Sequence, residues 1–184
     1  MARIPRVKIC GIRCRSDLEI ALGAGADALG FIVGARHRTE DELSPGDAAT
    51  LVGLLPPFVS SVLVTHLQEP RAILAISQEV APACLQLQDA MEAEAIPELR
   101  RSLTGVKLIQ AIHVLDEGAI QAAQAAEAAV DALLLDSRTA DRIGGSGRPH
   151  DWSISRRIVE QTSKPVILAG GLNPDNLTRA LLLV

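Results

Sequence analysis

Aromatic residues are almost absent from this chain of 184 residues, which contains two phenylalanines, one tryptophan and no tyrosine. The core must therefore be built from Ala, Leu, Ile and Val, the side chains that fill parallel α/β proteins. Hydrophobic residues make up 48% of the chain, which argues against intrinsic disorder. The length is typical of one domain with a sizeable core.

The chain also has few cysteines, no large excess of charge of one sign and no long apolar run. Cys10, Cys14 and Cys84 are too few and too irregularly spaced for a disulfide framework, and the C-x3-C pair lacks the second pair of a zinc site, so we expect no metal. A net charge of −4 without a basic stripe argues against a nucleic-acid partner. No run approaches the ~18 apolar residues of a membrane helix, and no signal peptide precedes the first strand-like segment. We expect a cytoplasmic protein that has reduced thiols and no membrane partner.

Short apolar runs alternate along the chain with segments of helical pattern. The seven pairs recur at about 20–30 residues, the rhythm of repeated βαβ units. The predicted strands are Val7–Ile12, Ala28–Val33, Val59–Val64, Ala83–Leu87, Lys107–His113, Ala132–Asp136 and Val166–Ala169. The predicted helices are Ser16–Ala24, Pro45–Leu54, Pro70–Val80, Glu92–Ser102, Glu117–Glu127, Ser153–Thr162 and Pro174–Leu183.

Local signals support several helix ends. Ser16 begins a Ser-Asp-Leu-Glu capping box, and Ser44-Pro45 and Asn173-Pro174 each pair an N-cap residue with a proline at the first helical position. Gly25 directly follows the predicted helix Ser16–Ala24, at the position where glycine commonly caps the C-terminal end of a helix. We therefore expect three helices to begin, and one to end, at these residues.

Seven such units are compatible with a doubly wound open sheet or with a TIM-type (β/α)8 barrel that lacks its eighth β/α unit. No G-x-G-x-x-G motif follows the first strand, which argues against a dinucleotide fold. Two glycine loops near the end of the chain, Gly144-Gly145-Ser146-Gly147 and Gly170-Gly171, favour the phosphate site of a barrel. We therefore predict one barrel domain over residues 1–184, incomplete at its C-terminal end.

Cys10 closes the first strand and is followed by Gly11. Because residues i and i+2 share a strand face, Lys8 should lie on the same side as the thiol, where its ammonium would favour the thiolate. Cys10 is then a candidate general base. A small buried hydrophobic residue is the competing interpretation, and the sequence leaves both open.

Asp136 closes the apolar strand Ala132–Asp136. A carboxylate in that position is costly to bury without a role, and partial burial would suit it to act as a general acid. The alternative is an aspartate that anchors a loop, paired with Arg138 or Arg142. His66 and His150 lie in predicted loops, where the sequence offers no ligand geometry.

Five motifs, in order along the chain, resemble the phosphoribosylanthranilate isomerase family. They are Val7-Lys8-Ile9-Cys10-Gly11-Ile12, Ala24-Gly25-Ala26-Asp27-Ala28-Leu29-Gly30-Phe31, Leu133-Leu134-Leu135-Asp136-Ser137, Gly144-Gly145-Ser146-Gly147 with Asp151-Trp152, and Leu168-Ala169-Gly170-Gly171-Leu172-Asn173-Pro174-Asp175-Asn176. The resemblance implies a (β/α)8 barrel that catalyses an Amadori rearrangement in tryptophan biosynthesis. It makes Cys10 the base at C2 and Asp136 the acid that opens the ribose ring.

The same resemblance implies a small phosphorylated substrate and no cofactor. Expected substrate or phosphate contacts are Lys8, Arg36, Gly144, Gly145, Ser146, Gly147, Gly170 and Gly171. The expected oligomeric state is a monomer or a homodimer.

Three features depart from the family pattern. The loop 34–43 lacks the usual Ser-Pro-Arg segment, so Arg36 or Arg38 would be the anion contact unless the loop is simply solvated. The usual Gln-Leu-His-Gly reads Gln86-Leu87-Gln88-Asp89, where Gln86 would satisfy backbone groups. The sequence ends at Val184, before an eighth unit. Two alternatives therefore stand beside the isomerase: an isomerase of another phosphorylated aminosugar, and a non-catalytic barrel for ligand binding or subunit interaction.

Overall fold

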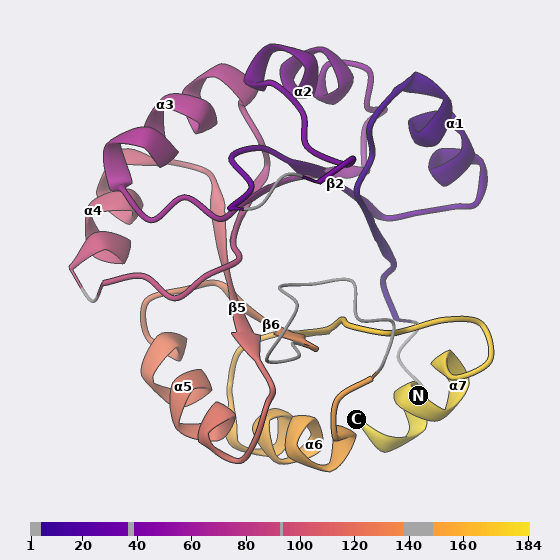
Figure 1. Ribbon diagram of the computed structural model, residues 1–184, viewed down its shortest axis with the longest axis vertical. Coiled ribbons are helices and arrows are strands. Elements are labelled where there is room, and N and C mark those ends of the chain that lie inside the picture. The colour runs from indigo at the N-terminus through magenta and orange to yellow at the C-terminus, as the bar shows by residue number, and fades with distance from the viewer. Residues whose placement is uncertain (1–4, 37–38, 93, 138–148) are drawn as a thin grey trace. The chain divides into compact units, whose positions relative to one another are not determined.

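The computed structural model describes residues 5–36, 39–92, 94–137 and 149–184 (Figure 1). The chain divides into two compact units, Met1–Leu108 and Ile109–Val184. All seven predicted strands and all seven predicted helices are present, each close to its expected bounds.

The first unit alternates strands and helices from β1 to α4. Its strands are β1 (Lys8–Cys10), β2 (Ala28–Ile32), β3 (Ser60–Thr65) and β4 (Cys84–Leu87), and its helices are α1 (Arg15–Gly23), α2 (Pro45–Val52), α3 (Pro70–Val80) and α4 (Ala95–Ser102). Neighbouring strands pair in parallel in chain order. The carboxyl ends of all four strands therefore meet at one edge of the sheet.

The second unit continues the alternation. It comprises β5 (Lys107–His113, whose first two residues belong to the first unit), α5 (Gly118–Glu127), β6 (Ala132–Asp136), α6 (Trp152–Gln161), β7 (Val166–Leu168) and α7 (Leu177–Leu183). β5 pairs with β6 and β6 with β7, again in parallel. Asp136 and the loop after β7 thus lie at the same edge of this sheet.

Aliphatic side chains fill the core of each unit, as the shortage of aromatic residues requires. In the first unit Leu29, Leu63 and Leu85 lie on three adjacent strands and are fully buried. In the second unit Leu133 and Leu135 of β6 are fully buried. Each such side chain stabilises the fold by about 1.5–3 kcal/mol relative to an exposed one.

Of the four helix ends predicted from capping signals, two agree with the structure and two do not. Ser44 caps α2, because its Oγ accepts a hydrogen bond from the backbone N–H of Asp47 at 3.1 Å. Gly25, with φ +84°, follows the end of α1, and its N–H donates to the Leu22 carbonyl at 3.0 Å. Both of these predictions are confirmed.

The other two helix starts were wrongly predicted. Helix α1 begins at Arg15, so Ser16 lies inside the helix and Cys14 is the N-cap. Helix α7 begins at Leu177, because the Asn173 Oδ1 accepts from the N–H groups of Asp175 and Asn176 and holds this segment as a turn.

No helix of the described residues is long and apolar enough to cross a membrane. A single domain over residues 1–184 stays a prediction.

Candidate active site

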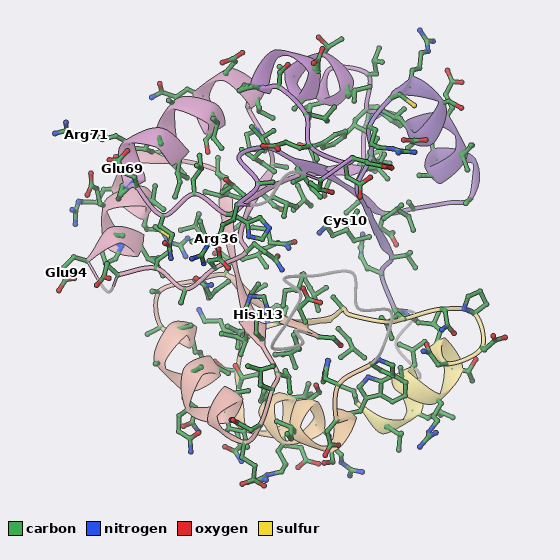
Figure 2. The ribbon with its side chains drawn as sticks, viewed as in Figure 1. Cys10, Arg36, Glu69, Arg71, Glu94 and His113 are labelled. Atoms are coloured by element: carbon green, nitrogen blue, oxygen red, sulfur yellow. The ribbon has the colours of Figure 1, made fainter. Side chains whose placement is uncertain are left out.

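Cys10 is the last residue of β1, and its thiol is exposed (Figure 2). It pairs in register with Gly30 of β2. A Cβ at position 30 would lie 2.9 Å from the Cys10 Sγ and 2.9 Å from the Lys8 Cε, so both side chains share the face above Gly30. The predicted common face is confirmed, and the interpretation of Cys10 as a buried hydrophobic residue is wrong. A small molecule can reach the thiol.

Lys8 begins a row of polar side chains that runs to β4 and just beyond it. The Lys8 Nζ donates to the Gln86 Oε1 at 2.6 Å, and the Gln86 Nε2 donates to the Gln88 Oε1 at 2.6 Å. Both glutamines are buried. The prediction that Gln86 satisfies backbone groups is wrong, because its amide connects two other side chains. The Lys8 ammonium is thereby held next to Cys10.

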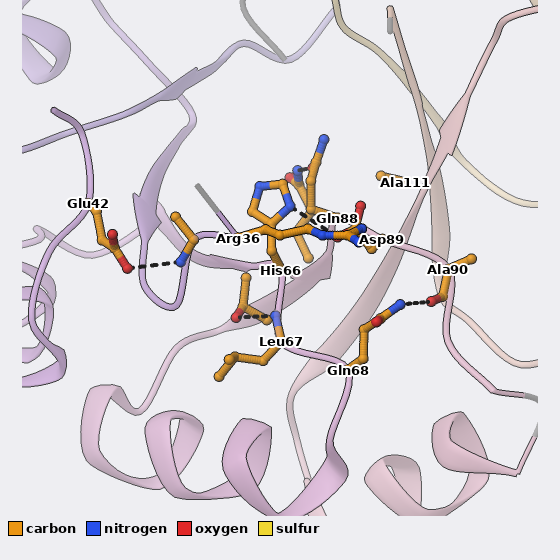
Figure 3. Close-up of polar contacts among 12 residues, drawn as sticks. Arg36, Glu42, His66, Leu67, Gln68, Gln88, Asp89, Ala90 and Ala111 are labelled. Carbon is orange, nitrogen blue, oxygen red and sulfur yellow. Dashed lines mark hydrogen bonds and ion pairs between the residues drawn. The ribbon is translucent and has the colours of Figure 1, made fainter. Parts of the chain in front are cut away.

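Asp89 lies two residues beyond β4 and joins two groups from neighbouring loops (Figure 3). Its Oδ2 is 3.3 Å from the Nδ1 of His66, which directly follows β3, and 4.0 Å from the Nη1 of Arg36. The Asp89 side chain is 6% exposed and that of Arg36 is 56% exposed. A buried carboxylate needs such partners to offset its loss of hydration.

The loop after β2 is tied down at both ends. The Glu42 Oε1 accepts from the N–H of Ala35 at 2.9 Å, and Ile32 forms an isolated parallel bridge with Glu42. Arg36 therefore extends toward Asp89 from a loop whose two ends are bonded to each other. Arg38, the alternative anion contact, lies outside the described residues.

In the second unit Asp136 ends β6 and is half-buried. The next residue, Ser137, is buried, and its Oγ lies 3.0 Å from the Nδ1 of His150 and accepts from the His150 backbone N–H at 3.0 Å. The His150 Nε2 lies 2.5 Å from the Ser155 Oγ. Burial lowers the pKa of His150, although the carboxylates of Asp136 and Asp151 act in the opposite direction. The ring is therefore held neutral between two hydroxyls near neutral pH.

The loop after β7 approaches the end of β6 very closely. Gly170 and Gly171 have φ angles of +80° and +66°, and a Cβ at Gly170 would overlap the backbone nitrogen of Ser137. The Ala169 N–H donates to the Leu135 carbonyl at 2.8 Å. Only glycine permits this approach with positive φ. The other predicted glycine loop, Gly144, Gly145, Ser146 and Gly147, lies outside the described residues.

Two polar groupings at the strand ends were missed by sequence analysis: His66 with Asp89, and His150 with its two serines. A signal existed for the first, because His66 and Asp89 follow the ends of consecutive predicted strands. The residues described hold no group of three or more His, Cys, Asp or Glu side chains arranged for a metal ion.

Comparison with known proteins bears directly on this site. The model of the N-(5'-phosphoribosyl)anthranilate (PRA) isomerase family matches residues 7–183. N-(5'-phosphoribosyl)anthranilate isomerase 2 of Methanosarcina mazei is 39% identical over 181 residues, which cover 97% of this chain and 80% of the relative. The chain belongs to the PRA isomerase family.

Two solved structures agree with the family assignment. Phosphoribosyl anthranilate isomerase from Thermotoga maritima superimposes with a TM-score of 0.85 at 31% identity, over 98% of this chain and 84% of the other. A phosphoribosyl anthranilate isomerase in complex with reduced 1-(o-carboxyphenylamino)-1-deoxyribulose 5-phosphate gives a TM-score of 0.81 at 30% identity, over 98% of this chain and 83% of the other. The predicted TIM-type barrel class is confirmed, and the described residues form seven of its β/α units. As a PRA isomerase, the chain is an enzyme of tryptophan biosynthesis.

Proposed function

We propose that this PRA isomerase converts N-(5'-phosphoribosyl)anthranilate to the corresponding aminoketose with Cys10 as general base and Asp136 as general acid. The match of the family model over residues 7–183 carries the proposal. The exposed thiol at the end of β1 and the half-buried carboxylate at the end of β6 support these roles, because barrel enzymes draw their catalytic groups from the carboxyl ends of several strands.

The reaction begins with ring opening. The protonated carboxyl of Asp136 gives its proton to the ribose ring oxygen as the C1–O bond breaks, and the lone pair of the amine nitrogen forms a C1=N bond. The Cys10 thiolate then removes the proton from C2, and the C–H electrons form a C1=C2 bond while the iminium nitrogen is neutralised. Tautomerisation then moves the proton of the C2 hydroxyl away and adds a proton to C1, which yields the ketone at C2. The rearrangement needs no external oxidant or reductant, because C1 gains one hydrogen as C2 loses one.

Lys8 supports the role of Cys10. Its ammonium chain lies beside the thiol above Gly30, and its bond to Gln86 holds it there. In the proposed site Lys8 therefore lies next to the substrate, and Cys10 is the residue that reacts with it.

We propose that the substrate's two anionic groups have separate contacts. Arg36 extends from an anchored loop and would bind an anion through its exposed guanidinium. The phosphate would be held by backbone N–H groups of Gly170-Gly171 and of Gly144, Gly145, Ser146 and Gly147. The positive φ angles of Gly170 and Gly171 support this, since glycine lets the backbone approach an anion closely.

The proposed setting is the cytoplasm, with a small phosphorylated molecule as the substrate and no nucleic acid or membrane as partner. Whether the enzyme is a monomer or a homodimer stays a prediction. Rescue of a tryptophan auxotroph that lacks PRA isomerase tests the proposed function. Growth without tryptophan supports it, and failure of a well-expressed chain to restore growth contradicts it. A Cys10→Ala chain at equal expression is the matched control.

A further inference from the structure

The Lys8 side chain reaches across the sheet of the first unit. It begins on β1, and its Nζ donates to the Gln86 Oε1 of β4 at 2.6 Å, although β2 and β3 lie between these two strands. Its path is open because residue 30 of β2 is glycine, where a Cβ would lie 2.9 Å from the Lys8 Cε. A lysine chain that crosses a glycine and is bonded at its far end keeps little rotamer freedom. Lys8 is therefore held in one place beside Cys10.

Gln88 fixes the orientation of the amide that receives Lys8. A glutamine amide has an oxygen on one side and an NH2 group on the other, and only the oxygen can accept the Lys8 hydrogen bond. The Gln86 Nε2 donates to the Gln88 Oε1 at 2.6 Å, so the opposite orientation of the Gln86 amide would place oxygen against oxygen. Gln86 and Gln88 are 3% and 8% exposed, so water competes little for these bonds. The buried pair therefore presents an acceptor to Lys8.

The Lys8 Nζ lies beside the thiol that acts as base in the proposed mechanism. Among the described residues it bonds only Gln86, so its other hydrogens can serve a ligand. Cys10 removes the proton from C2, and the oxygen on the same carbon becomes the ketone. We propose that Lys8 donates a hydrogen bond to this C2 oxygen as the ketone forms, and that Gln86 and Gln88 are the positioning residues that hold Lys8 toward it. The inference rests on the proposed function, because it takes C2 as the carbon that Cys10 deprotonates.

A positioning role of the glutamine pair differs from a purely structural one in its dependence on Lys8. If Gln86 acts by holding Lys8, its replacement changes the reaction rate only while Lys8 is present. If the buried amides merely support the packing of β4, the replacement has the same effect with or without Lys8. A double-mutant cycle measures this difference.

The test is such a cycle on the kcat of the 184-residue chain with N-(5'-phosphoribosyl)anthranilate. Gln86→Met should lower kcat about five- to tenfold, the worth of one hydrogen bond. Affinity for the reduced product analogue, reduced 1-(o-carboxyphenylamino)-1-deoxyribulose 5-phosphate, should change less, because the proposed bond is made as the ketone forms. In a Lys8→Met chain, which should itself have a lower kcat, Gln86→Met should lower kcat by less than about twofold. Gln86→Glu keeps an oxygen for Lys8 and should retain more of the kcat than Gln86→Met.

Two further variants complete the test. Gln88→Met leaves the Gln86 amide free to turn, so it should lower kcat about two- to fivefold in the wild-type chain and not in the Lys8→Met chain. Gln124→Met is the matched control, because it breaks an exposed glutamine pair between α5 and α6, in which the Gln124 Nε2 donates to the Gln161 Oε1 at 3.0 Å. It should leave kcat unchanged. Urea unfolding of each variant separates a loss of kcat from a loss of folded protein.

Two results would overturn the inference. One is a kcat of Lys8→Met equal to that of the wild-type chain, and the other is an equal loss of kcat from Gln86→Met with and without Lys8. In either case, wild-type turnover that Cys10→Ala abolishes leaves the proposed function standing. A folded wild-type chain that shows no turnover contradicts the proposed function, and the inference with it.

Discussion

The carboxyl strand ends of the two units offer different chemistry to a ligand. After β1 to β4 the groups are long and charged or strongly polar: Lys8 bonded to Gln86, and Arg36 and His66 around Asp89. Among the described residues after β6 and β7, the groups held against the strand ends are small: two serines on a neutral imidazole, and glycines packed against the backbone. Asp136 adds a half-buried carboxylate at the end of β6.

This difference suits a substrate with two unlike ends. An aromatic amino acid needs donors and acceptors at fixed positions, which oriented side chains provide. A phosphate is bound well by several backbone N–H groups where no Cβ intervenes. The proposed base, the exposed thiol of Cys10, belongs to the first unit, and the proposed acid, the half-buried carboxylate of Asp136, belongs to the second.

The largest expected effect belongs to the first unit. Cys10→Ala removes the general base, whose contribution is typically about 10²–10⁴-fold, so kcat should fall by at least that factor. Cys14→Ala is the matched control, because Cys14 is also an exposed cysteine. Its side chain makes no capping hydrogen bond to α1, so the change should not weaken the helix. It should stay within about threefold of the wild-type kcat. Turnover of Cys10→Ala equally close to wild type would exclude Cys10 as the base.

The corresponding change in the second unit is Asp136→Asn. The amide keeps the shape of the carboxyl but cannot deliver a proton, so kcat should collapse by about 10²-fold or more while affinity for the reduced product analogue changes little. Asp175→Asn, at an exposed carboxylate before α7, should leave kcat unchanged. A variant at Asp136 that keeps its turnover and only unfolds more readily would identify this residue as a loop anchor.

Gly170→Ala tests the close backbone packing of the second unit. The new Cβ combines positive φ with overlap against Ser137, which should cost about 2–4 kcal/mol in the free energy of unfolding. Gly105→Ala isolates the backbone strain, because Gly105 also has φ +83° but nothing lies within 4 Å of its Cβ position. It should cost about 1 kcal/mol. Equal losses in urea unfolding would contradict the close approach between the two loops.

The smallest expected effect is a pH dependence at His150. Its pKa is lowered in the folded state, so as pH falls below 6.5 the unfolded chain takes up a proton that the native chain does not. The free energy of unfolding therefore contains the full contribution of the neutral His150 ring above pH 6.5. This contribution decreases as the pH falls below 6.5, and the decrease stops once the pH is below the pKa of His150 in the folded state. The stability difference between wild type and His150→Gln should shrink between pH 7.5 and 5.5. A constant difference would show that His150 titrates alike in both states.

Much of the fold was predictable because local signals agreed with the tertiary structure. The apolar runs that predict β5 and β6 give their bounds without error, and Ser44-Pro45 marks the start of α2. The start of α7 was not predictable from Asn173-Pro174. Asn173 bonds the backbone of the next residues in the same way whether a helix or a turn follows, so the motif is ambiguous.

The candidate site was predictable only where a strand end and a motif coincide. Cys10, Lys8 and Asp136 met that condition. His66 and Asp89 follow the ends of consecutive predicted strands but belong to no motif, and their contact depends on the parallel register of β3 with β4, in which Thr65 pairs with Leu87. Twenty-three residues separate the two side chains along the chain, and no spacing rule connects them.

Steady-state turnover of N-(5'-phosphoribosyl)anthranilate by the purified 184-residue chain, read out as formation of the aminoketose, is the decisive measurement of the proposed function. We predict saturable turnover that depends on both Cys10 and Asp136. A chain that binds the reduced product analogue yet forms no aminoketose would contradict it.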